Sequence, residues 1–204
     1  TYLDEVHAVG LYGEGGRGVA FKNNVSNQID IINGTLAKGF GQIGGYIVAD
    51  QTTIDFVRSF ASGFIFTTSM MPSVAAAATK SIEIVEHLDK ERLDIFNKAK
   101  YFKQKLKILD IPFIDSESHI IPILTHETSR AKLFSRLLLE QYNSYIQPIF
   151  YPTVPEGSAR LRITITPKHS IKDIDELIAS LKRLFDSESS EQAMTLKARQ
   201  NQVA

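Results

Sequence analysis

The uneven distribution of glycine constrains the fold of this chain more than any other feature of its sequence. Eleven of the twelve glycines lie within residues 1–70, and the twelfth is Gly157. Glycines cluster where backbone segments pack closely or adopt positive φ. The apolar runs at 29–32 and 46–49 lie between these glycines and are typical of buried strands. The first third therefore predicts short strands joined by tight loops, with a short helix at 51–60.

The sequence pattern changes at Pro72. The composition and the three- and four-residue spacing of apolar side chains predict helices at 73–88 and 90–108. After Pro112, strand-like and helix-like segments alternate. They are predicted strands at 111–124, 145–150 and 160–166 and predicted helices at 127–142 and 171–185.

This order of elements predicts an α/β chain with two domains and a tail. We expect the C-terminal part of a large domain in residues 1–95, a small α+β C-terminal domain in residues 96–186, and a mobile polar tail in residues 187–204. The chain starts without methionine, and residues 1–3 resemble the end of a strand. We therefore expect a fragment of a longer protein.

Charge and composition exclude several classes of function. Lysine plus arginine and aspartate plus glutamate both total 23, so the formal net charge is zero, whereas proteins that bind nucleic acid through its backbone need a basic excess. The absence of cysteine excludes disulfides, thiolate metal sites and a cysteine nucleophile. No apolar run approaches the ~20 residues of a membrane helix. We expect a cytoplasmic protein without a nucleic-acid or membrane partner.

Asp4 and His7 form the first candidate site. Both follow the predicted strand end at 1–3, and open α/β sheets bind ligands at the carboxyl ends of their strands. The alternative is a loop aspartate beside an unrelated surface histidine, and the spacing alone does not separate the two. A metal site is not expected, because the spacing of these residues, like that of His119 and His126, fits no structural zinc pattern.

Lys38 stands alone as the lysine of a glycine-rich, nearly uncharged stretch at 33–45. A lysine in an apolar site has a lowered pKa, and its neutral amine can form a Schiff base. Thr35 can present a hydroxyl to an anion. A Walker-type phosphate loop is excluded, because Gly39 follows the lysine where that pattern requires serine or threonine. A flexible glycine linker fits poorly with the flanking strands.

Arg160 and Arg162 alternate with apolar residues, so both arginines are predicted on one face of a strand. An arginine binds a carboxylate through two parallel hydrogen bonds. A solvated basic face of an edge strand is the alternative.

Together these residue types match the requirements of pyridoxal phosphate. That cofactor needs a Schiff-base lysine, an acid for its pyridinium nitrogen, a phosphate donor and a clamp for the substrate carboxylate. Lys38, Asp4, Thr35 and one of the two arginines can fill these roles. We therefore predict pyridoxal phosphate as the cofactor.

Three motifs carry a resemblance to a known family. They are Asp4-Glu-Val-His-Ala-Val-Gly-Leu-Tyr-Gly13, Asp30-Ile-Ile-Asn-Gly-Thr-Leu-Ala-Lys38 and Gly63-Phe-Ile-Phe-Thr-Thr-Ser69. The chain resembles the α-oxoamine synthases, which are fold type I pyridoxal phosphate enzymes, and the third motif is typical of their 5-aminolevulinate synthase branch. The resemblance runs over residues 1 to about 185. It departs from the usual pattern at Gly39, where the family usually has alanine.

The resemblance implies a role for each residue of the first two motifs. Lys38 resembles the lysine that carries the cofactor and moves the α-proton of glycine. Asp4 resembles the carboxylate that keeps the pyridine nitrogen protonated, and His7 resembles the residue that hydrogen-bonds the cofactor's phenolic oxygen. Thr35 resembles a phosphate ligand.

The resemblance also implies residues that complete the site. Thr67 and Thr68 resemble a pair that reaches the cofactor phosphate of the other subunit, which implies a homodimer with a shared active site. Arg162 resembles the arginine that binds the glycine carboxylate, and Thr153 resembles a substrate-contacting residue.

The implied reaction is the decarboxylative condensation of glycine with succinyl-CoA, which gives 5-aminolevulinate, CoA and carbon dioxide and starts heme biosynthesis. Members of the family have a long segment before the strand that ends at Asp4, so we expect this chain to be inactive alone. One alternative is another α-oxoamine synthase, which makes 8-amino-7-oxononanoate or 2-amino-3-ketobutyrate. A non-catalytic partner subunit is a further alternative, against which the presence of Lys38 argues.

Overall fold

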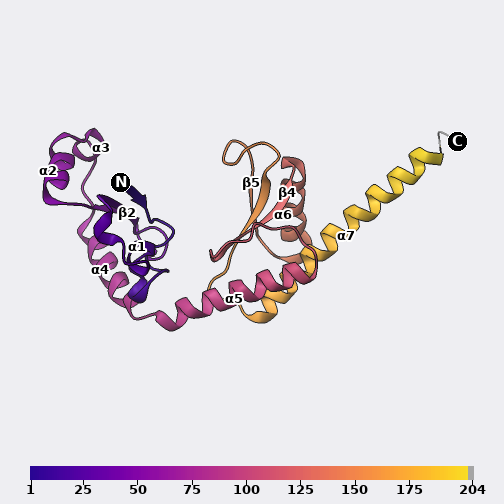
Figure 1. Ribbon diagram of the computed structural model, residues 1–204, viewed down its shortest axis with the longest axis horizontal. Coiled ribbons are helices and arrows are strands. Elements are labelled where there is room, and N and C mark those ends of the chain that lie inside the picture. The colour runs from indigo at the N-terminus through magenta and orange to yellow at the C-terminus, as the bar shows by residue number, and fades with distance from the viewer. Residues whose placement is uncertain (202–204) are drawn as a thin grey trace. The chain divides into compact units, whose positions relative to one another are not determined.

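Two three-stranded sheets organise the described part of the chain, one in each of the two units Thr1–Arg92 and Leu93–Ala204 (Figure 1). The computed structural model describes the backbone of residues 1–201 and the side chains of residues 1–187. The α/β character predicted from the order of elements is confirmed. The predicted domain limits at residues 95 and 186 stay predictions.

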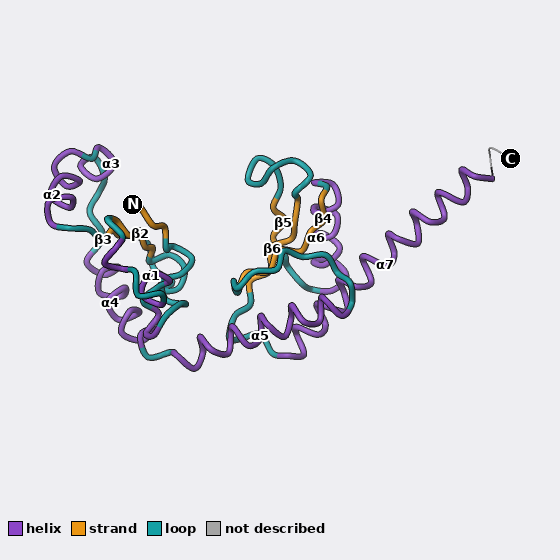
Figure 2. The backbone as a smooth tube through the Cα atoms, in the orientation of Figure 1, coloured by secondary structure: helices purple, strands orange, loops and turns teal. Residues whose placement is uncertain are grey.

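The sheet of the first unit is mixed, in the order β1-β2-β3. β1 (Tyr2–Asp4) pairs in parallel with β2 (Ile31–Thr35), and β3 (Gly45–Val48) pairs antiparallel with β2. Long loops join these strands, as the teal segments of Figure 2 show. The loop from β1 to β2 contains the short helices η1 (Glu14–Gly16), α1 (Val19–Lys22) and η2 (Ser26–Gln28).

Three helices follow β3 in the first unit, and their starts are set by local sequence. They are α2 (Gln51–Phe60), α3 (Ser62–Ile65) and α4 (Pro72–Glu86). The Asp50 carboxylate accepts a hydrogen bond from Thr53 N at 3.0 Å and so caps α2. Pro72 begins α4, where its missing N–H has no partner to lose.

Arg92, in the first turn of α5 (Asp89–Ile108), connects this helix to the end of α4. Its buried guanidinium donates to Val85 O at 2.6 Å and to Glu86 O at 3.0 Å, which satisfies the last carbonyls of α4. The same group donates to Asp89 Oδ1 at 2.7 Å in the first turn of α5. The buried Arg92 side chain therefore caps the end of the first predicted helix and also bonds to the first turn of the second.

The second unit contains an antiparallel sheet in the order β4-β6-β5. Its strands are β4 (Ile120–His126), β5 (Gln147–Ile149) and β6 (Ala159–Thr164). The helices α5, α6 (Thr128–Tyr142) and α7 (Ile171–Asn201) contribute side chains to one core with the sheet. Among the described helices, none combines the length and apolar content that crossing a bilayer requires.

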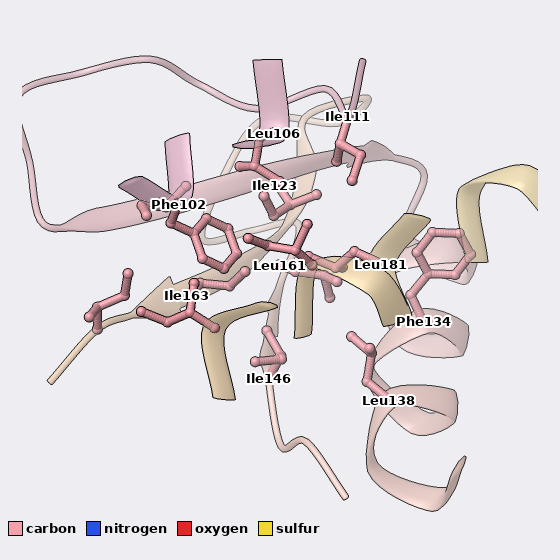
Figure 3. Packing of buried hydrophobic residues seen from close by; sticks show 14 of the residues in the cluster. Phe102, Leu106, Ile111, Ile123, Phe134, Leu138, Ile146, Leu161, Ile163 and Leu181 are labelled. Atoms are coloured by element: carbon pink, nitrogen blue, oxygen red, sulfur yellow. The ribbon is translucent and has the colours of Figure 1, made fainter. Parts of the chain in front are cut away.

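The core of the second unit follows from the alternation of β6 (Figure 3). Ala159, Leu161 and Ile163 are buried, whereas Arg162 and Thr164 are exposed on the opposite face, so the predicted alternation is confirmed. Around the buried face pack Phe102 and Leu106 of α5, Phe134 and Leu138 of α6, and Leu181 of α7.

The last helix is longer than its predicted end at residue 185. α7 continues to Asn201, because the segment after Ser187 is rich in Glu, Gln, Ala, Leu and Lys, which favour helix strongly. Residues 202–204 of the predicted tail lie outside the described residues.

Candidate active site

The carboxyl ends of β1 and β2 meet at one edge of the first sheet, which we call the carboxyl edge. The strands run in parallel with Asp4 opposite Asn33, and Glu5 N donates to Asn33 O at 2.8 Å just beyond this pair. The loop after β1 carries His7, and the loop after β2 carries Lys38. Open α/β sheets bind ligands at such an edge. The structure thus brings the candidates of the first two motifs to one edge of one sheet.

Lys38 lies in a closely turned loop between β2 and β3, which we call the lysine loop (36–44). Leu36 N donates to Gly44 O at 3.0 Å, and Gln42 N donates to Leu36 O at 2.7 Å. Gly44 has a φ of 118°, a conformation that glycine adopts without strain. Lys38 itself is exposed. The described residues of this unit therefore do not provide the apolar enclosure predicted for this lysine.

The loop after β1 packs directly against the residue that follows Lys38. A Cβ atom on Gly39 would lie 2.8 Å from Val9 O and 3.3 Å from Gly10 Cα, and both of these neighbours are backbone. The first distance is shorter than any side chain tolerates. This close approach accounts for the glycine at position 39, and it ties the lysine loop to the loop that carries His7.

Thr35 connects the two ends of the lysine loop through hydrogen bonds of its side chain. Its Oγ1 donates to Gly44 O at 3.1 Å and accepts a hydrogen bond from Ala37 N at 3.1 Å. The hydroxyl proton is thus engaged within the loop, and a phosphate oxygen would compete with Gly44 O for it. The phosphate-binding role of Thr35 stays a prediction, while the structure gives this residue a part in shaping the loop.

Asp4 and His7 are exposed at the carboxyl edge. Asp4 Oδ1 accepts a hydrogen bond from Val6 N at 2.9 Å, which holds the carboxylate at the end of β1. Successive side chains of a strand point to opposite faces of its sheet. Asp4 is exposed and Glu5, directly after the end of β1, is buried, which agrees with this alternation.

Glu5 is the residue at this edge that the sequence motifs did not single out. Only 2% of it is exposed. Its Oε2 accepts a hydrogen bond from Val19 N at 2.7 Å, and its Oε1 accepts one from Ala20 N at 2.7 Å, so the carboxylate satisfies two unpaired N–H groups at the start of α1. Its place beside Asp4 at a strand end predicts an inward side chain, but no sequence signal identifies partners fourteen residues away.

The segment that contains the third motif also reaches the lysine loop. Thr67 and Thr68 lie on the exposed stretch between α3 and α4. Two residues further, Met70 Cε would lie 2.6 Å from a Cβ atom on Gly44. Ser81 Oγ of α4 donates to Phe40 O at 2.6 Å and anchors the loop's backbone. The phosphate contact of the two threonines stays a prediction.

Arg162 and Thr153 belong to the second unit. Arg162 is exposed on β6, between Pro122 of β4 and Gln147 of β5. It borders a groove of about 600 Å³ whose lining also includes His169. Thr153 is exposed in the turn after β5. The substrate contacts of the two residues stay predictions.

Comparisons with known proteins place these features in a family. The profile of the family described as aminotransferase class I and II matches residues 1–181. The chain is 46% identical over 187 residues to a 5-aminolevulinate synthase of Rhodobacter capsulatus, covering 91% of this chain and 46% of the relative. It is 45% identical over 188 residues to the 5-aminolevulinate synthase of Rhizobium meliloti, with the same two coverages.

Solved structures give the same result for the fold. The serine palmitoyltransferase of Sphingomonas wittichii superposes with a TM-score of 0.84 at 26% identity, over 93% of this chain and 48% of that one. The 8-amino-7-oxononanoate synthase of Francisella tularensis superposes with a TM-score of 0.82 at 21% identity, over 92% of this chain and 55% of that one. The latter likeness concerns the fold alone.

The chain spans just under half the length of the curated relatives it matches. The resemblance drawn from the three motifs is confirmed by these similarities. Because the family profile covers residues 1–181, both sheets lie within the match. The chain belongs to the aminotransferase class I and II family.

Proposed function

We propose that this chain supplies the cofactor-binding lysine and the substrate-binding arginine of a 5-aminolevulinate synthase. Such an enzyme uses pyridoxal phosphate to condense glycine with succinyl-CoA, and it releases 5-aminolevulinate, CoA and carbon dioxide as the first step of heme biosynthesis. The observation that carries the proposal is the 45–46% identity to 5-aminolevulinate synthases over 91% of the chain.

The donor set at the carboxyl edge fits pyridoxal phosphate. The cofactor requires a primary amine, a carboxylate and hydroxyl or backbone donors for its phosphate. Lys38 offers an exposed amine on a loop with defined backbone hydrogen bonds, and Asp4 offers a carboxylate at the end of the adjacent strand. His7 follows Asp4 on the same loop and is proposed to hydrogen-bond the phenolic oxygen of the cofactor.

When bound, the cofactor supplies an electron sink for the negative charge that develops at the substrate's α-carbon. In our proposal the Lys38 amine holds the cofactor and then takes the α-proton of glycine, for which it must be neutral. Asp4 keeps the ring nitrogen protonated. Arg162 binds the glycine carboxylate through paired hydrogen bonds. The enclosure that would favour a neutral Lys38 is proposed to come from outside the first unit, because the described residues leave this amine exposed.

Borohydride reduction tests the assignment of Lys38. The natural polypeptide containing this sequence is loaded with pyridoxal phosphate and reduced, and the labelled peptide is mapped by mass spectrometry. We expect the label on Lys38, its loss in Lys38→Ala, and no change in the control Lys80→Arg, which alters an exposed lysine of α4. A label on a different lysine of the wild-type protein would overturn the proposal.

A related α-oxoamine synthase is the second candidate, because the chain superposes on serine palmitoyltransferase with a TM-score of 0.84 at 26% identity. Steady-state rates with succinyl-CoA, acetyl-CoA and pimeloyl-CoA separate these activities. We expect the highest kcat/KM with succinyl-CoA. A higher value with either of the other two would favour the second candidate.

We also propose a homodimer with a shared active site. Support comes from exposed aromatic side chains on α2, α3 and the following segment, where Phe66 is 87% exposed and Phe60 is 70% exposed. Apolar clusters of this kind mark interaction surfaces. Analytical ultracentrifugation of the natural polypeptide tests the dimer, and a monomer at all concentrations would contradict it. The cytoplasmic location stays a prediction that cell fractionation tests.

A further inference from the structure

We propose that Glu5 is a positioning residue for the active site, which sets the place of the Lys38 loop through the loop that carries His7. This inference rests on the proposed function. Its basis is the buried carboxylate that joins the end of β1 to the start of α1.

Glu5 is fixed at both its backbone and its side chain. Its N–H donates to Asn33 O at 2.8 Å, which ties it to β2 beside the site. Its two carboxylate oxygens each accept one backbone N–H, from Val19 and from Ala20, at 2.7 Å. Hydrogen bonds to an ionised carboxylate are about twice as strong as neutral ones. The residue therefore pins residue 19 of the chain to the end of β1.

Gly18 has the conformation and the space that this contact requires. Its φ is 104°, and a Cβ atom at this position would lie 2.0 Å from Glu5 Oε2. A side chain at position 18 would displace the carboxylate, so the position of the Glu5 side chain depends on a glycine at position 18. The loop between them, which we call the β1–α1 loop (6–18), is consequently held at both of its ends.

The β1–α1 loop transmits this constraint to the lysine loop. Its course is defined by Gly10 N donating to Gly16 O at 2.7 Å and by Gly18 N donating to Tyr12 O at 2.7 Å. Val9 O then lies 2.8 Å from the Cβ position of Gly39, the neighbour of Lys38. A shift of the loop's anchored end therefore moves its contact with Gly39, and it moves His7 as well.

A glutamine at position 5 keeps the shape but not the hydrogen-bonding. Its amide offers one acceptor oxygen, while its NH₂ group faces a backbone N–H that also donates. We expect Glu5→Gln to release one of the two N–H groups and to loosen the β1–α1 loop. Glu5→Asp keeps both acceptors on a side chain one CH₂ shorter, so it should restore part of the contact.

The control is Asp50→Asn, which removes the charge from another carboxylate that caps a helix of the same unit. Asp50 directly precedes α2 and is not part of the β1–α1 loop. In the chain without cofactor, we expect Glu5→Gln to reduce the hydrogen-exchange protection of the Val19 and Ala20 amides by about 10-fold or more, since bonds to charged groups contribute about 1.5–3 kcal/mol. Asp50→Asn should leave these two amides unchanged.

The decisive measurements use the natural polypeptide with pyridoxal phosphate. We expect Glu5→Gln to lower the apparent cofactor affinity at Lys38, read from borohydride-fixed label, at least several-fold and to shift the visible absorption maximum of the bound cofactor. We expect Glu5→Asp to recover part of both effects and Asp50→Asn to match wild type. If Glu5→Gln does not fold, Glu5→Asp against Asp50→Asn carries the comparison.

Two results would overturn the proposal in different ways. Reduced amide protection with unchanged cofactor affinity and absorption would make Glu5 a purely structural cap, while the proposed function stands. Failure of wild-type protein to take the label at Lys38 would refute the proposed function, and the role of Glu5 would fall with it.

Discussion

Replacement of Leu161 by alanine should be among the most damaging single changes in the second unit. Leu161 is fully buried on β6, the central strand, where the side chains of three helices surround it (Figure 3). Leucine to alanine removes three carbon groups, each contributing about 0.8 kcal/mol through burial. A remaining cavity adds about 1 kcal/mol for each ~40 Å³. Because β6 is flanked by strands on both sides, little collapse is expected, and the total comes to about 3–4.5 kcal/mol.

Leu139 is the matched control, because it is a leucine of the same unit that lies half exposed on α6. We expect Leu139→Ala to cost less than about 1 kcal/mol. Native-state hydrogen exchange at the β6 amides measures the unfolding free energy of this unit directly. A loss below about 1.5 kcal/mol for Leu161→Ala, or equal losses for the two variants, would show that the core around β6 is not packed as described.

Further predictions concern caps, buried charge and a crowded glycine. Ser170→Ala removes the hydroxyl that accepts from Asp173 N at 3.1 Å and should cost about 1 kcal/mol in urea unfolding. The hydrogen bonds from Ser170 hold the pKa of Asp173 below its usual range, so its contribution to stability is present above the unfolded pKa and lost as pH falls through the folded one; Asp173→Asn should reduce this loss in acid titration. Burial lowers the pKa of Lys103. Between this folded-state pKa and the normal lysine value, the native state therefore binds fewer protons than the unfolded state. The free energy of unfolding should rise with pH in that window, and Lys103→Met should flatten the rise. Gly34→Ala would place a Cβ atom 2.3 Å from Tyr46 Cζ; the displaced ring should become more solvated, and its pKa, now raised mainly by burial, should return toward 10.0 in an NMR titration.

The sequence predicted the elements whose pattern is local. The alternation of Arg160 to Thr164 predicts β6 and its buried face, because a strand's two faces are readable from neighbouring residues. The glycine-rich first third predicts strands joined by tight loops, whereas the parallel pairing that brings Asp4 and the lysine loop to one edge is known only from the structure.

The remaining features depend on tertiary structure and could not be predicted in the same way. In the sequence, Glu5 stands between the candidates Asp4 and His7, and no local pattern marks it as buried. Its burial depends on the free space at Gly18 and on the Val19 N–H, which lies beside the carboxylate only in the folded loop. The exposure of Lys38 is set by tertiary contacts, which the local sequence around the lysine does not encode. The length of α7 was missed because its polar C-terminal half has helix formers but weak apolar periodicity.

The contact between Gly39 and Val9 O links two positions that are thirty residues apart. A methyl group at position 39 is excluded by the backbone of another segment and not by its own φ, so no substitution within the lysine loop can make room for it. Relatives that carry alanine there should therefore show a displaced backbone at positions 9–10. An exchange of Gly39 for alanine in this chain should therefore be tolerated only if the backbone of that segment moves away.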